Sequence, residues 1–146
     1  MGHRILYLEG KFIGRGLNHS AEPFTGTMTL APVWGNSGTA LSFTAIGDDG
    51  QIYHDERTVL GVDPGHQIHM ASASNNTGAL LLYVAETIED DRLVFRFGDL
   101  GDRGTFRETR EVHVHDNGDV TYRFSWGPPG EPVRERSVVR MTPDHV

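Results

Sequence analysis

The sequence predicts an all-β fold, a single antiparallel up-and-down barrel of about ten strands spanning residues 1–146. Turn-forming residues recur at short intervals, the stretches between them alternate between apolar and polar side chains, and no long helix is indicated. Ten short strands joined by hairpins would leave two open sheet edges, and closing the sheet on itself removes both. A barrel is therefore favoured over a sandwich.

Clusters of Gly, Asp, Asn and Pro divide the chain at residues 47–50, 61–65, 74–78, 89–91, 99–104, 116–119 and 127–132. The pair Asn117-Gly118 lies between two alternating runs and is a strong hairpin signal. In chain order we expect strands at residues 10–19 with a bend near 12, 24–33, 38–46, 51–60, 66–73, 79–88, 92–98, 105–115, 119–126 and 132–141. A short helix or a cap over the barrel mouth is expected only within residues 17–24.

Composition excludes several classes of function. The 13 Lys and Arg against 20 Asp and Glu give a net charge of -7, which would repel nucleic acid. Without cysteine the chain has no disulfide, no thiolate metal site and no Cys nucleophile. No segment approaches the roughly 20 apolar residues of a membrane span, and the N-terminus lacks the apolar stretch of a signal peptide. We expect a cytoplasmic protein with no membrane partner.

Three segments resemble the calycin superfamily. The run Gly10-Lys11-Phe12-Ile13-Gly14-Arg15-Gly16 is similar to the G-x-W-x-G-x-G opening of nitrobindin-type proteins, with Phe12 in the Trp position. Residues 49–64 resemble the middle of DUF1579-type lipocalin-like proteins, and residues 106–140 resemble the end of that family. The resemblance implies a ten-stranded calycin barrel that holds a ligand, with Phe12 closing one end.

The resemblance also raises the question of haem. Nitrobindin-type proteins bind haem through a histidine on a C-terminal strand, whereas the corresponding residues 132–141 contain no histidine. We therefore expect no haem and no other cofactor. Within the resembling opening, Gly14 and Gly16 would let the first strand bend and let a neighbouring backbone approach closely.

Charged residues in register with apolar ones identify the candidate ligand site. In a barrel, alternate residues of each strand face inward. In three predicted strands, the alternate residues that share a face with apolar neighbours include ionisable side chains. These are His54 and Glu56 within 52–60, Glu108 and Arg110 within 106–114, and Glu135 within 133–141. Buried charges must pair with each other, with water or with a ligand. The alternative is that these strand ends are solvated and carry ordinary cross-strand pairs at the rim.

Arg110 is the main candidate for binding a ligand. Its planar guanidinium can hold a carboxylate or a polarised carbonyl, and Glu135 or Glu108 is its expected protein partner. Aromatic residues expected on the inner faces belong to the core or line a pocket. The proposed ligand-binding set is Phe12, Tyr83, Phe95, Glu108, Arg110, Tyr122, Phe124, Trp126 and Glu135.

The histidines give a weaker signal for a metal site than the inward charges give for a ligand site. His113 and His115 lie on one strand face with a spacing that suits zinc or iron, but the register places both outside. We therefore expect no metal. His54 lies on an inward row two residues before Glu56 and is the better candidate for a general base.

Two hypotheses remain from these residues. The first is a protein that binds a small, largely apolar molecule, with a polar group held by the inward Arg and Glu. The second is a cofactor-free cyclase, isomerase or lyase in which Glu56 and His54, or a Tyr, act as acid and base. An uncompensated group with a perturbed pKa would favour the enzyme, and a fully paired arginine would favour the binding protein. We also expect a homodimer, because four apolar residues fall on outer faces: Leu80, Leu82, Val84 and Val138.

Overall fold

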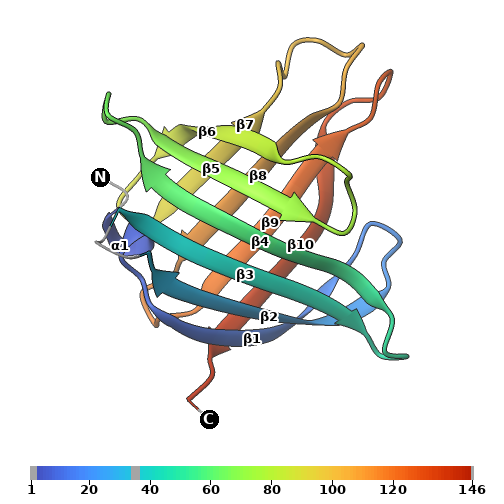
Figure 1. Ribbon diagram of the computed structural model, residues 1–146. Helices are drawn as coiled ribbons and strands as arrows, with labels where there is room; N and C mark the ends of the chain where they lie inside the picture. The colour runs from blue at the N-terminus through green and yellow to red at the C-terminus, as the bar shows by residue number, and fades with distance from the viewer. Residues whose placement is uncertain (1–2, 34–36, 146) are drawn as a thin grey trace.

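A computed structural model describes residues 3–33 and 37–145 as a closed barrel of antiparallel strands (Figure 1). This confirms the predicted fold class. The strands are β1 (Gly10–Leu17), β2 (Pro23–Pro32), β3 (Gly38–Gly47), β4 (Ile52–Val62), β5 (Ile68–Ser74), β6 (Leu81–Ile88), β7 (Arg92–Phe97), β8 (Arg107–Val114), β9 (Val120–Gly127) and β10 (Arg134–Pro143). Each strand pairs with its neighbours in sequence, and β1 pairs with β10 to close the barrel. Within the described residues, no helix has the length and apolar character that crossing a membrane requires.

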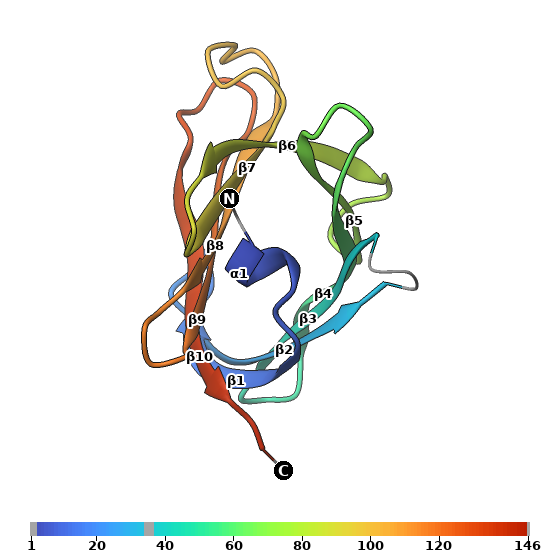
Figure 2. The ribbon, with the colours of Figure 1, turned by 90° about the vertical axis from the view of Figure 1, so that its left-hand side faces the viewer.

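One end of the barrel is closed by α1 (His3–Leu6), which Figure 2 shows lying inside the ring of strands. Ile5 and Leu6 are buried in the core, and the hydroxyl of Thr39 on β3 donates to the carbonyl of Leu6. Of the two expectations for residues 17–24, the short helix is wrong, whereas the connection does lie at the mouth of the barrel cavity described below. That connection is a turn in which the amides of Ser20 and Glu22 donate to the side chain of Asn18, so the turn needs no helical hydrogen bonds.

Two glycines of β1 allow the barrel to close. A Cβ on Gly14 would overlap the carbonyl oxygen of Arg140, and one on Gly16 would lie 2.6 Å from that of Val138. Both carbonyls belong to β10. Any larger residue would push the two strands apart, so the expected close approach of a neighbouring backbone is confirmed.

The core includes aliphatic, methionine and aromatic side chains from α1 and from every strand. Phe12 and Phe95 both belong to it, with 3% and 0% of their surfaces exposed. Phe12 lies opposite Met28 and Pro143 at the barrel seam. Neither phenylalanine reaches the cavity described below, so both are packing residues and their expected ligand contact was wrong.

A β-bulge reverses one predicted orientation. The register between β9 and β10 shifts between Glu135 and Ser137. Because successive side chains alternate between the two faces, an extra residue reverses the alternation beyond it. Glu135 consequently lies on the outer surface, where it accepts a hydrogen bond from Arg123 at 2.7 Å. The expectation that Glu135 points inward and pairs with Arg110 was wrong, and Arg136 lines the interior instead.

Candidate ligand-binding pocket

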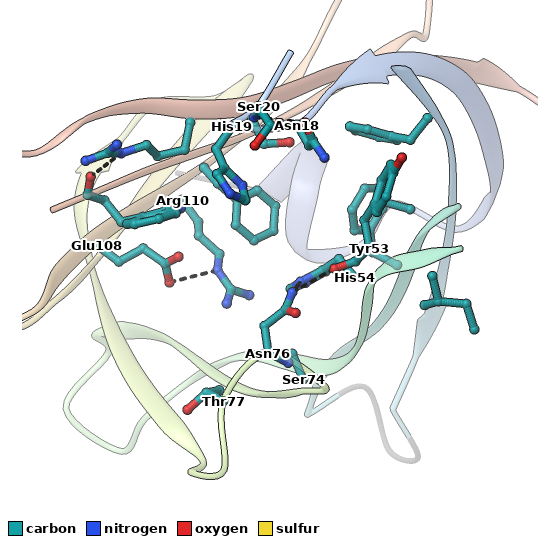
Figure 3. Close-up of a pocket in the computed structure, with 18 of the residues that line it drawn as sticks. Asn18, His19, Ser20, Tyr53, His54, Ser74, Asn76, Thr77, Glu108 and Arg110 are labelled. Atoms are coloured by element: carbon teal, nitrogen blue, oxygen red, sulfur yellow. Dashed lines mark hydrogen bonds and ion pairs between the residues drawn. The ribbon is translucent and has the colours of Figure 1, made fainter. Parts of the chain in front are cut away.

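A cavity of about 690 Å³ occupies the end of the barrel opposite α1 (Figure 3). Its walls are largely apolar and aromatic, and its rim is formed by the polar connections that follow β1, β3 and β5. The apolar lining residues are Phe24, Phe43, Ala45, Ile52, Leu81, Phe106, Phe124 and Trp126. A volume of this size is typical of small-molecule sites.

Arg110 on β8 is the centre of a buried polar network at the bottom of this cavity. Its Nη1 donates to Glu56 Oε2 at 3.0 Å and to Ser72 Oγ at 2.8 Å, and lies 3.4 Å from the hydroxyl of Tyr122. Its Nε donates to Glu108 Oε1 at 3.2 Å. The guanidinium therefore joins residues of β4, β5, β8 and β9 through the barrel interior.

Glu56 has a low pKa in this setting. Burial by itself would raise the pKa of the carboxyl group, but the charge of Arg110 and the hydrogen bonds from His54 and Thr58 outweigh it and lower the pKa to about 2. The hydroxyl of Tyr122 also donates to both carboxylate oxygens, at 3.1 and 3.0 Å. Glu56 is thus ionised at neutral pH and fully paired.

Glu108 connects the network to the cavity. Its Oε1 accepts hydrogen bonds from Arg110 and from the hydroxyl of Tyr83, while its side chain lines the cavity beside Arg110 (Figure 3). Burial raises the pKa of both Tyr83 and Tyr122 above the usual tyrosine value, so both hydroxyls keep their protons and act as donors. The guanidinium of Arg110 also packs 4.9 Å from the centre of the Tyr83 ring.

His54 is held by hydrogen bonds at both ring nitrogens. Its Nε2 lies 2.9 Å from Glu56 Oε1. Its Nδ1 lies 2.7 Å from Asn76 Nδ2, and Figure 3 shows these two side chains together. The Asn76 amide nitrogen also donates to the carbonyl of Tyr53 at 3.0 Å, which assigns it as the donor to the histidine. The proton of His54 is therefore on Nε2 and points to Glu56.

The predicted site residues fall into four groups. Those that line the cavity are His54, Glu108, Arg110, Phe124 and Trp126. Those that lie beneath it within the polar network are Glu56, Tyr83 and Tyr122. Phe12 and Phe95 pack in the core, and Glu135 lies outside.

Sequence reasoning missed several residues of the cavity. Asn76 and His19 lie in connections, where no alternation indicates which way a side chain points. Arg136 was missed because the bulge in β10 reverses the alternation from which its orientation was predicted. Its guanidinium lies 4.4 Å from the centre of the Trp126 ring, and His19 contacts the same ring edge-on at 5.8 Å. Ser72, which belongs to the polar network below the cavity, was also missed. Its inward position could have been predicted, because it lies two residues after buried Met70 on β5.

The pair His113 and His115 lies outside the cavity. The two rings are 4.2 Å apart, with His113 3.4 Å from Asp91 and His115 2.7 Å from Thr121. In the described part of the chain, no group of three or more potential metal ligands comes together.

The similarity of the chain to known proteins is structural. No protein-family model matches it, and no curated protein matches it in sequence. The crystal structure of Rv2717c from M. tuberculosis has a similar fold, with a TM-score of 0.72 and 16% identity over 94% of this chain and 93% of that one. A de novo designed fluorescence-activating β-barrel aligns with a TM-score of 0.43 and 13% identity over 94% of each chain.

At this level of identity, the Rv2717c comparison concerns the fold alone. The described residues form a closed ten-stranded antiparallel barrel, and its fold is similar to that of Rv2717c.

Proposed function

We propose that this protein binds a small, largely apolar molecule in the barrel cavity, with a polar group of that molecule held by Arg110 and Glu108. One observation carries the proposal. A buried guanidinium lies at the bottom of an apolar-walled cavity, and its Nη2 donates to none of the described residues. A donor that borders a largely apolar cavity and has no protein acceptor can be satisfied by an oxygen of a ligand.

The state of the ionisable groups supports binding over catalysis. Arg110 pairs with two carboxylates, and the low pKa of Glu56 results from that compensation rather than from an isolated charge. Both nitrogens of His54 are occupied, which leaves the imidazole no lone pair to accept a substrate proton. The cofactor-free cyclase, isomerase or lyase considered from the sequence therefore has less support than a binding protein.

Filling the cavity tests the proposal. Ala45 lies on β3 and lines the cavity, whereas Ala40 lies on the outer face of the same strand. Nile red, an uncharged apolar dye, should bind the wild-type protein and the Ala40→Phe variant with similar affinity. The Ala45→Phe variant should bind it at least ~10-fold more weakly, because the new ring occupies the dye's space.

The same experiment can contradict the proposal. Equal dye binding by the Ala45→Phe and Ala40→Phe variants would place the apolar site outside the cavity. Mass spectrometry of the intact protein under non-denaturing conditions gives an independent check, since a bound apolar compound should be present in the wild type and reduced in the Ala45→Phe variant.

A further inference from the structure

We propose that the ligand group that reaches Arg110 is uncharged and both accepts and donates a hydrogen bond, as a primary amide does. This inference rests on the proposed function and specifies the chemistry of its ligand. It differs from the expectation that an inward arginine holds an acid.

The charges at the bottom of the cavity disfavour an anion. The guanidinium of Arg110 is 3.0 Å from a carboxylate oxygen of Glu56 and 3.2 Å from one of Glu108. The three side chains formally carry one positive and two negative charges. A ligand carboxylate would add a third negative charge in a site shielded from water, where like charges repel strongly.

Apart from their Nε–Oε1 contact, the side chains of Arg110 and Glu108 leave one donor group and one acceptor unused. In the described residues, Arg110 Nη2 has no acceptor and Glu108 Oε2 has no donor, while Nε of the same guanidinium already binds Oε1 of the same carboxylate. Nη2 and Nε share the central carbon of the guanidinium, and the two carboxylate oxygens share theirs. The free donor and the free acceptor therefore belong to two side chains that are already in direct contact. A group such as a primary amide can accept from Nη2 and donate to Oε2.

Aromatic rings and hydrogen-bond partners around the Arg110 guanidinium leave a ligand access only to its Nη2 side. The guanidinium carbon lies 4.6 Å from the centre of the Phe124 ring and 4.9 Å from that of Tyr83. Nη1 is occupied by Glu56 and Ser72. Nη2 is thus the part of the group left for a ligand in the cavity.

The other ionisable residues of the cavity lie nearer its rim. Arg136 stacks on Trp126 and has no carboxylate within 4.0 Å among the described residues, whereas Glu22 contributes an exposed negative charge. His54 carries its proton toward Glu56, and His19 is exposed. An acidic ligand group would therefore find its unpaired positive partner at the rim, in Arg136, and not at the bottom.

Three probes with the same alkyl chain test the inference: decanamide, decanoate and decylamine, each competed against Nile red near pH 7. The comparison is made in the wild type and in the Arg136→Gln variant, which removes the positive charge at the rim. The result in the variant decides whether the inference holds, because decanoate can no longer bind to Arg136 there. There we expect decanamide to displace the dye at a concentration at least ~10-fold lower than decanoate. Decylamine should be weaker than decanamide, since its ammonium group cannot accept from Nη2.

A second variant checks the cause of this preference. Glu108→Gln keeps the shape of the side chain and removes one negative charge. The ratio between the concentrations of decanoate and decanamide that displace the dye should therefore fall several-fold. If decanoate displaces the dye more readily than decanamide in the Arg136→Gln variant, the inference is wrong while the proposed binding function stands. If Nile red binds but none of the probes displaces it, the inference also fails. If the dye and all probes fail to bind the wild type, the proposed function itself fails.

Discussion

Glu56 on β4 and Arg110 on β8, 54 residues apart in the chain, form an ion pair through the barrel interior with 3.0 Å between Oε2 and Nη1. At most 3% of either side chain is exposed. Because both side chains are almost entirely buried, removing one partner leaves the other as an uncompensated charge. The pair therefore affects both the stability of the barrel and the polarity of the cavity above it.

Stability should fall in acid because of Glu56. Its pKa is about 2 in the folded protein against the ordinary value of 4.5, so the folded state favours the ionised form. The resulting stabilisation is fully present above pH 4.5 and is lost as the pH falls toward 2. The wild type should lose about 3 kcal/mol over this window relative to Glu56→Gln, as measured by urea unfolding at several pH values. Parallel pH profiles of the two proteins would contradict this assignment.

Replacing Arg110 should weaken the fold as well as the site. Arg110→Leu leaves Glu56 and Glu108 unpaired inside the barrel and should lower the free energy of unfolding by about 3–5 kcal/mol, besides weakening ligand binding. The double variant Arg110→Leu with Glu56→Gln should lose at least about 1 kcal/mol less than the sum of the two single changes, because the residues are in direct contact. Additive losses in denaturant unfolding would show that the pair is not coupled.

The bulge in β10 predicts opposite outcomes for two adjacent residues. Glu135→Gln alters an exposed ion pair and should change the free energy of unfolding by less than about 0.5 kcal/mol, with unchanged tryptophan emission. Arg136→Gln removes a cation from the face of Trp126 and should alter that emission. Fluorescence spectra of the two variants and of Trp126→Phe check this. An emission change on Glu135→Gln but not on Arg136→Gln would mean that the register shift is misplaced.

The expected homodimer should form through one side of the barrel. Leu80 and Leu82 have 62% and 66% of their surfaces exposed, and Val59 and Val62 are exposed as well. A shallow hollow of about 360 Å³ joins Leu82 to both valines across β5. Such apolar surface often marks an interface between copies.

Sedimentation at micromolar concentration tests this. The wild type should sediment as a dimer, and Leu82→Lys should shift it toward monomer. Val138→Lys is the control. The sequence pattern groups Val138 with the two leucines, but Val138 lies on β10, separated from β6 by three strands, and does not share their patch. A wild-type monomer, or a dimer lost only on the Val138 change, would remove this interface.

Local chemistry determined most of the fold. Turn residues and the alternation of side chains are properties of neighbouring residues, so they indicated ten strands and their approximate ends. The inward position of Arg110 was also predictable, because a slip of one residue would have exposed Val112 and Val114, which are buried. The same parity placed Glu56 and Glu108 inside.

Only the tertiary structure decided which of these groups meet. Arg110 does pair with Glu108, as expected, but its second partner is Glu56, from a strand on another part of the barrel wall. Glu135 is not a partner, because one bulge turned it outward and Arg136 inward. A bulge depends on pairing with the adjacent strand, and contact through the barrel depends on its closure. Asn76 and His19 reach the cavity from connections whose paths are set by the strands they join. The sequence determined the strands and their faces through local interactions, whereas the long-range geometry of the closed sheet determined the polar network and the cavity.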